Sequence, residues 1–291
     1  MDSSLIIQVL INGLFIGGIY ACVSIGFSLI WGVTSFLNVA QGEFVMVSAF
    51  TTYWLFKLLH IDPFLSLIVI IPAMYFLGYY LEKYVLDEII GVNPFITILF
   101  TFGLSLLISN IALRIFAPDI RVIITSYSEV SIKIGGISIP AIRMVIFLFA
   151  LAVTGALFLF LKKTRIGNAI RAASQNRKAA ITMGIDIREI FAVAFGIGIA
   201  ITGVGGSLLA IVSPINPLMG ISFVLKAFVV SVLGGVGSLR GAFIGGILLG
   251  LCEDYSSLFI SSNVKNAIAA VILILILIVR PKGIFGERGV E

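Results

Sequence analysis

The stretch "GLFIGGIYACVSIGFSLIWGV", residues 13–33, decides the fold. It contains no charged residue and lies inside a longer uncharged run from Ser3 to Gly42. About 20 apolar residues are enough for a helix to cross roughly 30 Å of hydrocarbon. Lipid offers the backbone no hydrogen-bond partners, and this run is too long for a barrel strand. The stretch therefore predicts a membrane-spanning helix.

The rest of the 291-residue chain has the same character. Hydrophobic residues make up 60% of it, charged residues 11%, and the mean hydropathy is +1.19. We expect an all-α polytopic membrane protein that forms a single transmembrane domain over residues 1–291, with eight or nine spans. The candidate spans are residues 5–33, 39–58, 64–81, 95–113, 141–161, 190–212, 221–233, 242–260 and 264–279.

Two of these segments could be broken or re-entrant elements. Segment 221–233 is short and runs into "LGGVGSLRGAFIGG", residues 233–246, and Pro94 stands at the start of another segment. A bilayer tolerates such irregular elements only where protein or a water-filled cavity covers the freed backbone groups. Glycines at 198, 203, 205 and 206 lie on one further segment and predict close packing between helices.

The basic residues predict an orientation. Most of the net charge of +5 comes from residues between or beyond the apolar runs, where topology signals rather than nucleic-acid sites are expected. The densest cluster lies in a loop at about residues 162–189, and more basic residues follow the last span. We expect this loop and the C-terminus to be cytoplasmic and the N-terminus to be outside. The longest outer loop is then about residues 114–140, where "IKIGGISIP" predicts a β-hairpin.

No motif for catalysis is present. The single histidine, His60, stands alone at the end of a span, and the chain contains no P-loop, metal-ligand cluster or nucleophile motif. We therefore expect no catalytic residue, no metal site and no directly bound cofactor.

The loop sequence "TRIGNAIRAASQNRKAAITMGI", residues 164–185, predicts two short helices. Thr164 can cap the first helix, Ser174 or Asn176 can cap the second, and Gly184 ends the pattern. Its many small residues favour a helix that enters a groove on another protein, whereas a helix lying on lipid would need a large apolar face. The residues expected to carry this contact are Gly167, Ala169, Arg171, Ala172, Asn176, Ala179, Ala180 and Gly184.

This loop resembles the coupling helix of ABC importer permeases, in the form found in branched-chain amino acid permeases of the Liv type. Other stretches resemble the same family, namely "LNVAQGEF" (37–44), "INPLMG" (215–220), "LKAFVVSVLGGVGSLRGAFIGGILLG" (225–250) and "RPKGIFG" (280–286). The resemblance covers essentially the whole chain. Gln41 stands where many relatives have histidine, which argues against a proton-carrying role at that position.

The resemblance implies the transmembrane permease subunit of an ATP-driven importer in a prokaryotic cytoplasmic (inner) membrane. A second, homologous permease would complete the solute pathway, two cytoplasmic ATPases would bind ATP and Mg²⁺, and an extracytoplasmic protein would deliver the solute. Branched-chain or other hydrophobic amino acids are the expected cargo. The alternatives are an ABC permease for urea or an amide, a simple sugar or a nucleoside, and an ion-coupled secondary transporter.

Five residues in or beside the spans are candidates for a pathway or gate. Glu43 is either a first-turn acid that favours the helix dipole, with Asn38 as the cap, or a gate at the cytoplasmic mouth. Lys226 either snorkels outward or, as the family motif favours, faces an internal cavity. Gly237 belongs to a packed turn or to a hinge, and Asn93 either lines a pathway or satisfies helix backbone.

Overall fold

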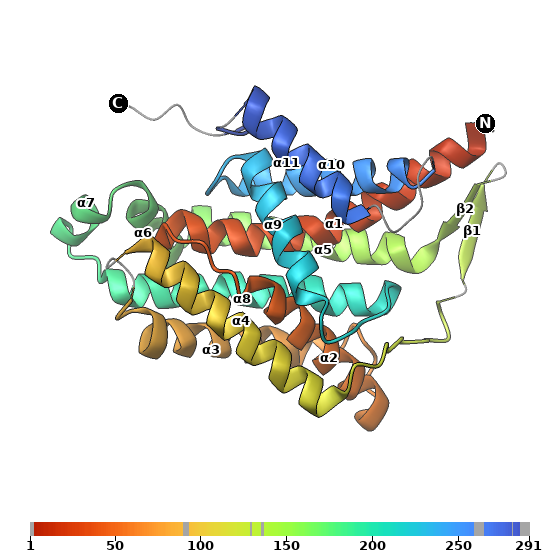
Figure 1. Ribbon diagram of the computed structural model, residues 1–291, viewed down its shortest axis with the longest axis horizontal. Coiled ribbons are helices and arrows are strands. Elements are labelled where there is room, and N and C mark those ends of the chain that lie inside the picture. The colour runs from red at the N-terminus through yellow and green to blue at the C-terminus, as the bar shows by residue number, and fades with distance from the viewer. Residues whose placement is uncertain are drawn as a thin grey trace.

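The computed structural model describes residues 3–89, 93–128, 130–134, 137–258, 265–280 and 282–285. The described chain is an elongated bundle of helices with one small hairpin (Figure 1). Its elements are α1 (Ser3–Thr34), α2 (Gln41–Leu59), α3 (Leu67–Leu81), a π-helical turn η1 (Glu82–Leu86), α4 (Pro94–Phe116), β1 (Ser131–Ile134), β2 (Ile137–Pro140), α5 (Ala141–Lys163), α6 (Arg165–Gln175), α7 (Arg177–Thr182), α8 (Ile187–Val212), α9 (Gly220–Gly234), α10 (Leu239–Ser256) and α11 (Lys265–Val279). The predicted all-α polytopic fold is confirmed.

Each predicted span coincides with a helix, but the helices differ in length. Within the described residues, α1, α4, α5 and α8 are each long and apolar enough to cross a membrane. The pair α9 and α10 passes that test only together and is bent by 118° at its break, as expected of the broken segment. Pro94 does not interrupt a span, because it occupies the first turn of a continuous α4. The total of eight or nine spans therefore remains a prediction.

The two ends of the bundle differ in the segments that they hold. At one end the start of α1 meets the hairpin, where Gln8 Nε2 donates to the carbonyl oxygen of Ser138 at 3.2 Å. At the other end lie α6, α7 and the α9–α10 turn, and Ile284 N donates to the carbonyl oxygen of Leu233 at 2.8 Å (Figure 1). We call these the hairpin end and the loop end. The predicted orientation places the N-terminus and loop 114–140 on one side of the membrane, and loop 162–189 and the C-terminal tail on the other. The two ends of the bundle hold these segments in the same two groups.

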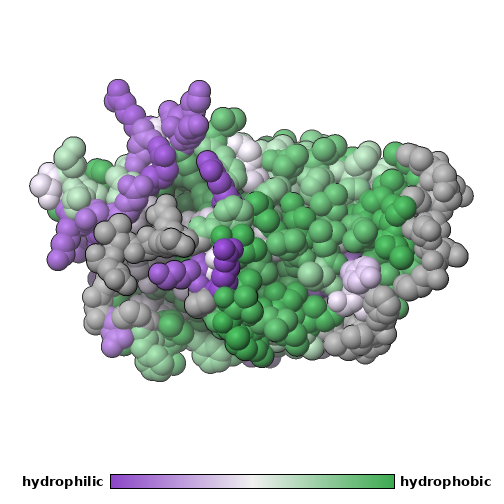
Figure 2. All heavy atoms as spheres, turned by 90° about the horizontal axis from the view of Figure 1, so that it is seen from above, coloured by the Kyte–Doolittle hydropathy of each residue, from purple (hydrophilic) through white to green (hydrophobic). Residues whose placement is uncertain are grey.

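The hairpin and the distribution of polar residues also follow the sequence. Strands β1 and β2 pair antiparallel, with Ile134 opposite Ile137. Figure 2 shows hydrophilic side chains gathered at the loop end and a largely hydrophobic surface along the adjoining body. This division is what a membrane-spanning bundle requires.

Helix α8 forms the centre of the bundle, and its side chains are almost all buried. Its glycines allow neighbouring backbones to approach closely: a side chain at Gly26 of α1 would overlap Gly198, and one at Gly206 would overlap Val45 of α2. Gly203 packs in the same way against Met74 of α3. The predicted close packing of the glycine-rich helix is confirmed.

The segments that lead from α1 into α2 and from α8 into α9 share a short sequence pattern. After α1 comes "NVAQG" (38–42) and after α8 comes "NPLMG" (216–220), each leading into the next helix. Each turn contains the same kind of hydrogen bond. Asn38 Oδ1 accepts from Ala40 N at 3.1 Å, and Asn216 Oδ1 accepts from Leu218 N at 2.9 Å. From neighbouring starts, α2 runs toward the hairpin end, where Trp54 stacks on Phe116, and α9 runs toward the loop end, where the turn after it lies beside α6. Helix pairs of opposed direction are found in transporters.

The start of α2 corrects two details of the prediction. Gln41 contacts Thr202, which lies 202 − 187 = 15 residues beyond the start of α8, or about 22 Å along it at 1.5 Å per residue. The second span therefore begins deep in the bundle rather than at a surface. Ala40 occupies the N-cap position, and Asn38 instead bonds the backbone of Ala40 just before the helix.

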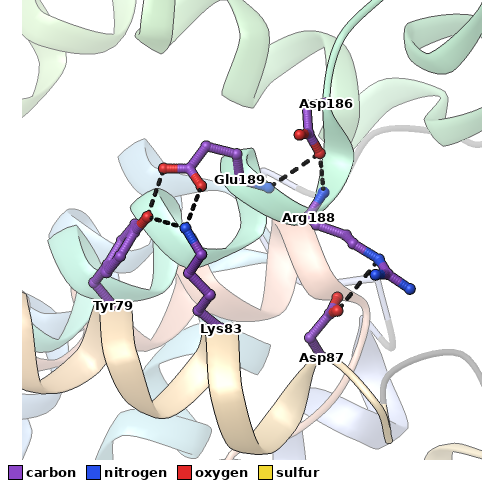
Figure 3. A network of polar contacts seen from close by, with 6 residues as sticks. All are labelled: Tyr79, Lys83, Asp87, Asp186, Arg188 and Glu189. Atoms are coloured by element: carbon purple, nitrogen blue, oxygen red, sulfur yellow. Dashed lines mark hydrogen bonds and ion pairs between the residues drawn. The ribbon is translucent and has the colours of Figure 1, made fainter.

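A polar network ties the start of α8 to the end of α3 at the loop end (Figure 3). Glu189 accepts hydrogen bonds from Tyr79 Oη at 2.7 Å and Lys83 Nζ at 3.0 Å. Arg188 and Asp87 form a second contact, 3.3 Å between Nε and Oδ2. These contacts fix the position of η1 beside α8.

Glu82 of η1 lies buried beside this network, and neither of its carboxylate oxygens has a hydrogen-bond partner. Burial, assisted by the negative charges of Asp87 and Glu189, raises the pKa of Glu82 to about 8. A carboxyl group whose pKa is raised by folding favours the folded state most below its ordinary pKa. That contribution is lost as pH rises from the ordinary pKa through the folded one.

We therefore expect the melting temperature of the purified chain to fall between pH 5 and pH 8, in part because of Glu82. Glu82→Gln should be more stable than wild type at pH 8 and show a smaller dependence on pH, measured by thermal unfolding in detergent. The exposed neighbour Glu88 provides the control, and Glu88→Gln should keep the wild-type dependence. An unchanged pH profile in Glu82→Gln would contradict the assignment.

Candidate functional site

The first candidate site is the helix junction, which we define as residues 38–43 and 216–220, where α2 and α9 begin. Gln41 is fully buried there, and its Nε2 donates to Thr202 Oγ1 at 2.5 Å. Its Oε1 accepts from Asn38 Nδ2 at 3.1 Å. A side chain at Gly42 would overlap the carbonyl group of Gly220, so the two helix starts touch through glycine backbone. The junction is therefore a polar centre inside an apolar bundle.

Glu43 is the charged residue of this junction and is only 2% exposed. It lies in the first turn of α2, as predicted, where a negative charge favours the helix dipole. Its Oε1 accepts from Ser105 Oγ of α4 at 3.1 Å, while Oε2 has no hydrogen-bond partner and lies against Gly220. An uncompensated carboxylate oxygen in an apolar bundle is costly. Glu43 can therefore accept a further donor or cation at the helix junction.

Lys226 corrects one of the two alternatives predicted for it, because its side chain is buried and does not snorkel outward. Its Nζ is 2.9 Å from Glu253 Oε2 of α10 and 2.7 Å from Tyr20 Oη of α1. Tyr20 Oη in turn donates to Glu253 Oε2 at 2.7 Å. Both charged side chains are buried. The group joins α1, α9 and α10 inside the bundle.

Sequence reasoning missed Glu253, although "LCEDYS", residues 251–256, places two acids inside a predicted span. A buried lysine needs a counter-charge, so the search for a partner of Lys226 could have found it. The chain therefore carries more buried charge than its sequence indicated.

The second candidate site is the loop of α6 and α7, and its predicted local structure is confirmed. Thr164 Oγ1 accepts from Gly167 N at 2.9 Å and caps α6. Asn176 Oδ1 accepts from Ala179 N at 3.0 Å and caps α7, whereas Ser174 bonds the carbonyl oxygen of Arg171 instead. Gly184 follows α7 with φ of +79°, a conformation that favours glycine.

The side chains of this loop divide into inward and outward groups. Gly167 and Ala180 are buried within this chain, and a side chain at Gly167 would press on the backbone of Leu161. They are therefore unavailable for docking, contrary to expectation. Ala169 and Ala172 are half-buried, and the outward group consists of Arg171, Asn176, Ala179 and Gly184.

Two exposed apolar residues at the tip of the loop were missed by sequence reasoning. Ile181 is 56% exposed and Met183 is 81% exposed. They flank Thr182, the last residue of α7, and stand out from the polar loop end. Their signal in the sequence was two large apolar residues close together in the stretch "RKAAITMG", residues 177–184, which is otherwise small, polar or basic. Exposed apolar patches occur at contacts with other proteins or with membranes, so these two residues are a candidate contact.

The remaining candidates lie elsewhere. Asn93 is exposed and caps α4, with its Oδ1 accepting from Phe95 N at 2.9 Å. Gly237 has φ of +77° in the α9–α10 turn and packs on Gly32. Of the predicted pathway residues, the junction brings together only Asn38 and Glu43.

A multi-pass bundle with a sharply bent helix pair and a buried polar centre has features that membrane transport proteins share. The family described as "Branched-chain amino acid transport system / permease component" matches residues 9–279, and the chain belongs to it. The resemblance noted in the sequence is thereby confirmed.

Several relatives match along nearly their whole length. The chain is 31% identical to the high-affinity branched-chain amino acid transport system permease protein BraD of Pseudomonas aeruginosa, covering 98% of this chain and 97% of the relative. It is 31% identical, with the same coverage, to the corresponding protein LivH of Escherichia coli K12. A ribose import permease protein, RbsC of Haemophilus influenzae, is 28% identical over 48% of the chain and 44% of its own length. A comparison with solved structures finds no match.

The buried group of Tyr20, Lys226 and Glu253 gives a stability test. Lys226→Met should leave the Glu253 carboxylate buried without its counter-charge, at a cost of about 3–5 kcal/mol. Membrane abundance and melting temperature should both fall. The triple variant Tyr20→Phe/Lys226→Met/Glu253→Leu should recover most of the loss, because apolar groups of similar size can replace a buried ion pair. Wild-type stability of Lys226→Met alone would contradict this role.

Proposed function

We propose that the chain is the membrane-embedded, non-catalytic permease subunit of an ATP-driven importer of branched-chain or other hydrophobic amino acids. The observation that carries the proposal is the family match over residues 9–279, together with relatives whose printed names specify branched-chain amino acid transport. ATP and Mg²⁺ would bind to two separate cytoplasmic subunits. A second permease and an extracytoplasmic solute-binding protein would complete the assembly. The ribose import permease among the relatives keeps a small sugar as the second candidate cargo.

The helix junction would form part of the solute pathway. Its Glu43 offers a carboxylate oxygen without a partner at a point where two helices begin inside the bundle. An amino acid carries an ammonium group, which can donate a hydrogen bond to this oxygen. An ammonium group pairs with this carboxylate by charge as well as by hydrogen bond, whereas a sugar hydroxyl offers the hydrogen bond alone, so the carboxylate favours the amino-acid cargo.

The loop of α6 and α7 would be the contact for an ATPase subunit. The exposed Ile181 and Met183 would enter a groove on that subunit, with the polar and small side chains of the loop around them. Asp186 Oδ1 accepts from Arg188 N at 3.1 Å and from Glu189 N at 3.3 Å, so a displacement of the loop would reach the first turn of α8.

Substitution of Met183 tests the contact and the function together. Wild-type assembly with its ATPases, second permease and solute-binding protein should take up leucine in proteoliposomes only when ATP is supplied. Met183→Glu should reduce co-purification of the ATPases and leucine uptake at least about tenfold, because it places a charge in a packed apolar contact.

The matched control is Ile120→Glu at the hairpin end, a residue that is 68% exposed. This variant should retain ATPase binding. Full ATPase binding by Met183→Glu would move the contact elsewhere, and leucine uptake by the chain alone, without ATP, would favour a secondary transporter.

The basic loop end is proposed to be cytoplasmic, with the N-terminus outside. In a Cys22→Ser/Cys252→Ser background, Ser174→Cys should resist a membrane-impermeant thiol reagent applied to intact cells, and Ser128→Cys should react. The reverse pattern would invert the orientation and remove the ATPase contact from the loop.

A further inference from the structure

A cavity of about 700 Å³ opens at the loop end, between the ends of α1 and α5, helix α6 and the α9–α10 turn. Three cationic side chains line it, one from each of three elements: Lys162 of α5, Arg171 of α6 and Arg240 at the start of α10. Three serine residues, Ser28, Ser174 and Ser238, also line it. The cavity thus gathers positive charge and hydrogen-bond donors from distant parts of the chain.

No acidic side chain is among the described residues that line this cavity. Arg171 donates to the neutral Asn168 Oδ1 at 2.6 Å, and within the described structure neither Lys162 nor Arg240 has an ion pair. Ser238 caps α10 by accepting from Gly241 N at 3.1 Å, so the positive end of an 18-residue helix also lies there. Like charges repel, and an anion placed among three cations lowers their electrostatic energy.

The cavity has an apolar wall as well as a cationic one. Leu29, Phe158 and Leu159 contribute to it, and Leu159 is 60% exposed on the outer side of α5. The wall therefore continues onto the apolar surface of a membrane-spanning helix. A free amino acid fits this arrangement poorly, because its ammonium group would meet three cations.

We propose that this cavity binds the phosphate headgroup of an anionic phospholipid, whose acyl chains lie along Phe158 and Leu159. Basic pockets between membrane helices, close to the membrane surface, suit such headgroups. The bound phosphate, with its one negative charge, lies among Lys162, Arg171 and Arg240, reduces their mutual repulsion and links α6 to the α9–α10 turn. This site is distinct from the helix junction and from the exposed tip of the loop.

Lipid binding to the purified full-length chain tests the proposal. The chain is placed in phosphatidylcholine nanodiscs that contain a small fraction of phosphatidylglycerol, and the retained lipid is measured by native mass spectrometry. Wild type should retain phosphatidylglycerol selectively. Lys162→Ala and Arg240→Ala should each weaken retention about fivefold, and the double variant about 25-fold, since one cation near an anionic headgroup contributes about 1 kcal/mol.

Lys163→Ala is the matched control, since Lys163 is the exposed neighbour of Lys162 and does not line the cavity. It should retain the lipid as wild type does. Equal retention of the two lipids, or an equal loss in Lys163→Ala, would overturn the proposal.

Two further measurements distinguish other occupants. Displacement of the lipid by millimolar inorganic phosphate would assign the site to a soluble anion and overturn the lipid assignment. Loss of the lipid when ATPase subunits are added would assign the cavity to a protein interface. Neither result depends on leucine uptake, so failure of this proposal is separable from failure of the proposed function.

Discussion

The close approach of α1 to α8 is the constraint on which the rest of the structure depends. Lipid gives apolar helices little reason to associate, so a membrane bundle is held by backbone packing and hydrogen bonds between helices. Gly26 and Gly198 remove the side chains that would separate these two helices. The segments that follow α1 and α8 then meet as well, which brings Gln41 to Thr202 and Gly42 to Gly220. The polar junction is thus a consequence of glycine packing.

The opposed directions of α2 and α9 give this junction a second property. Because the two helices begin side by side and end at opposite ends of the bundle, the junction lies where segments from both ends meet. Transporters of this architecture place binding sites where broken helices begin near the middle of the membrane. The buried group of Tyr20, Lys226 and Glu253 ties α9 to α1 and α10, so a rotation of α9 would carry these neighbours with it.

Local features could be predicted from the sequence, and features set by tertiary packing could not. The helices, the hairpin, the caps at Thr164 and Asn176, and the end at Gly184 follow from hydropathy and from backbone chemistry over a few residues. The pairing of Lys226 with Glu253 and the burial of Ala180 depend on which helix faces which. The start of α2 inside the bundle also lay beyond local reasoning, although the repeated Asn-x-x-x-Gly segments could have indicated it.

Under the proposed function, α8 links the site of ATP-dependent movement to the solute pathway. In its first turn, the backbone of Glu189 donates to Asp186 of the loop and the Glu189 side chain accepts from Lys83. About 22 Å further along the helix, Thr202 accepts a hydrogen bond from Gln41 at the junction. Close packing on almost every side prevents α8 from bending freely. A displacement of the loop would therefore move α8 as a rigid body and shift the start of α2 relative to α9. The burial of α8 that makes it the core of the fold is also what makes it suitable for transmitting that displacement.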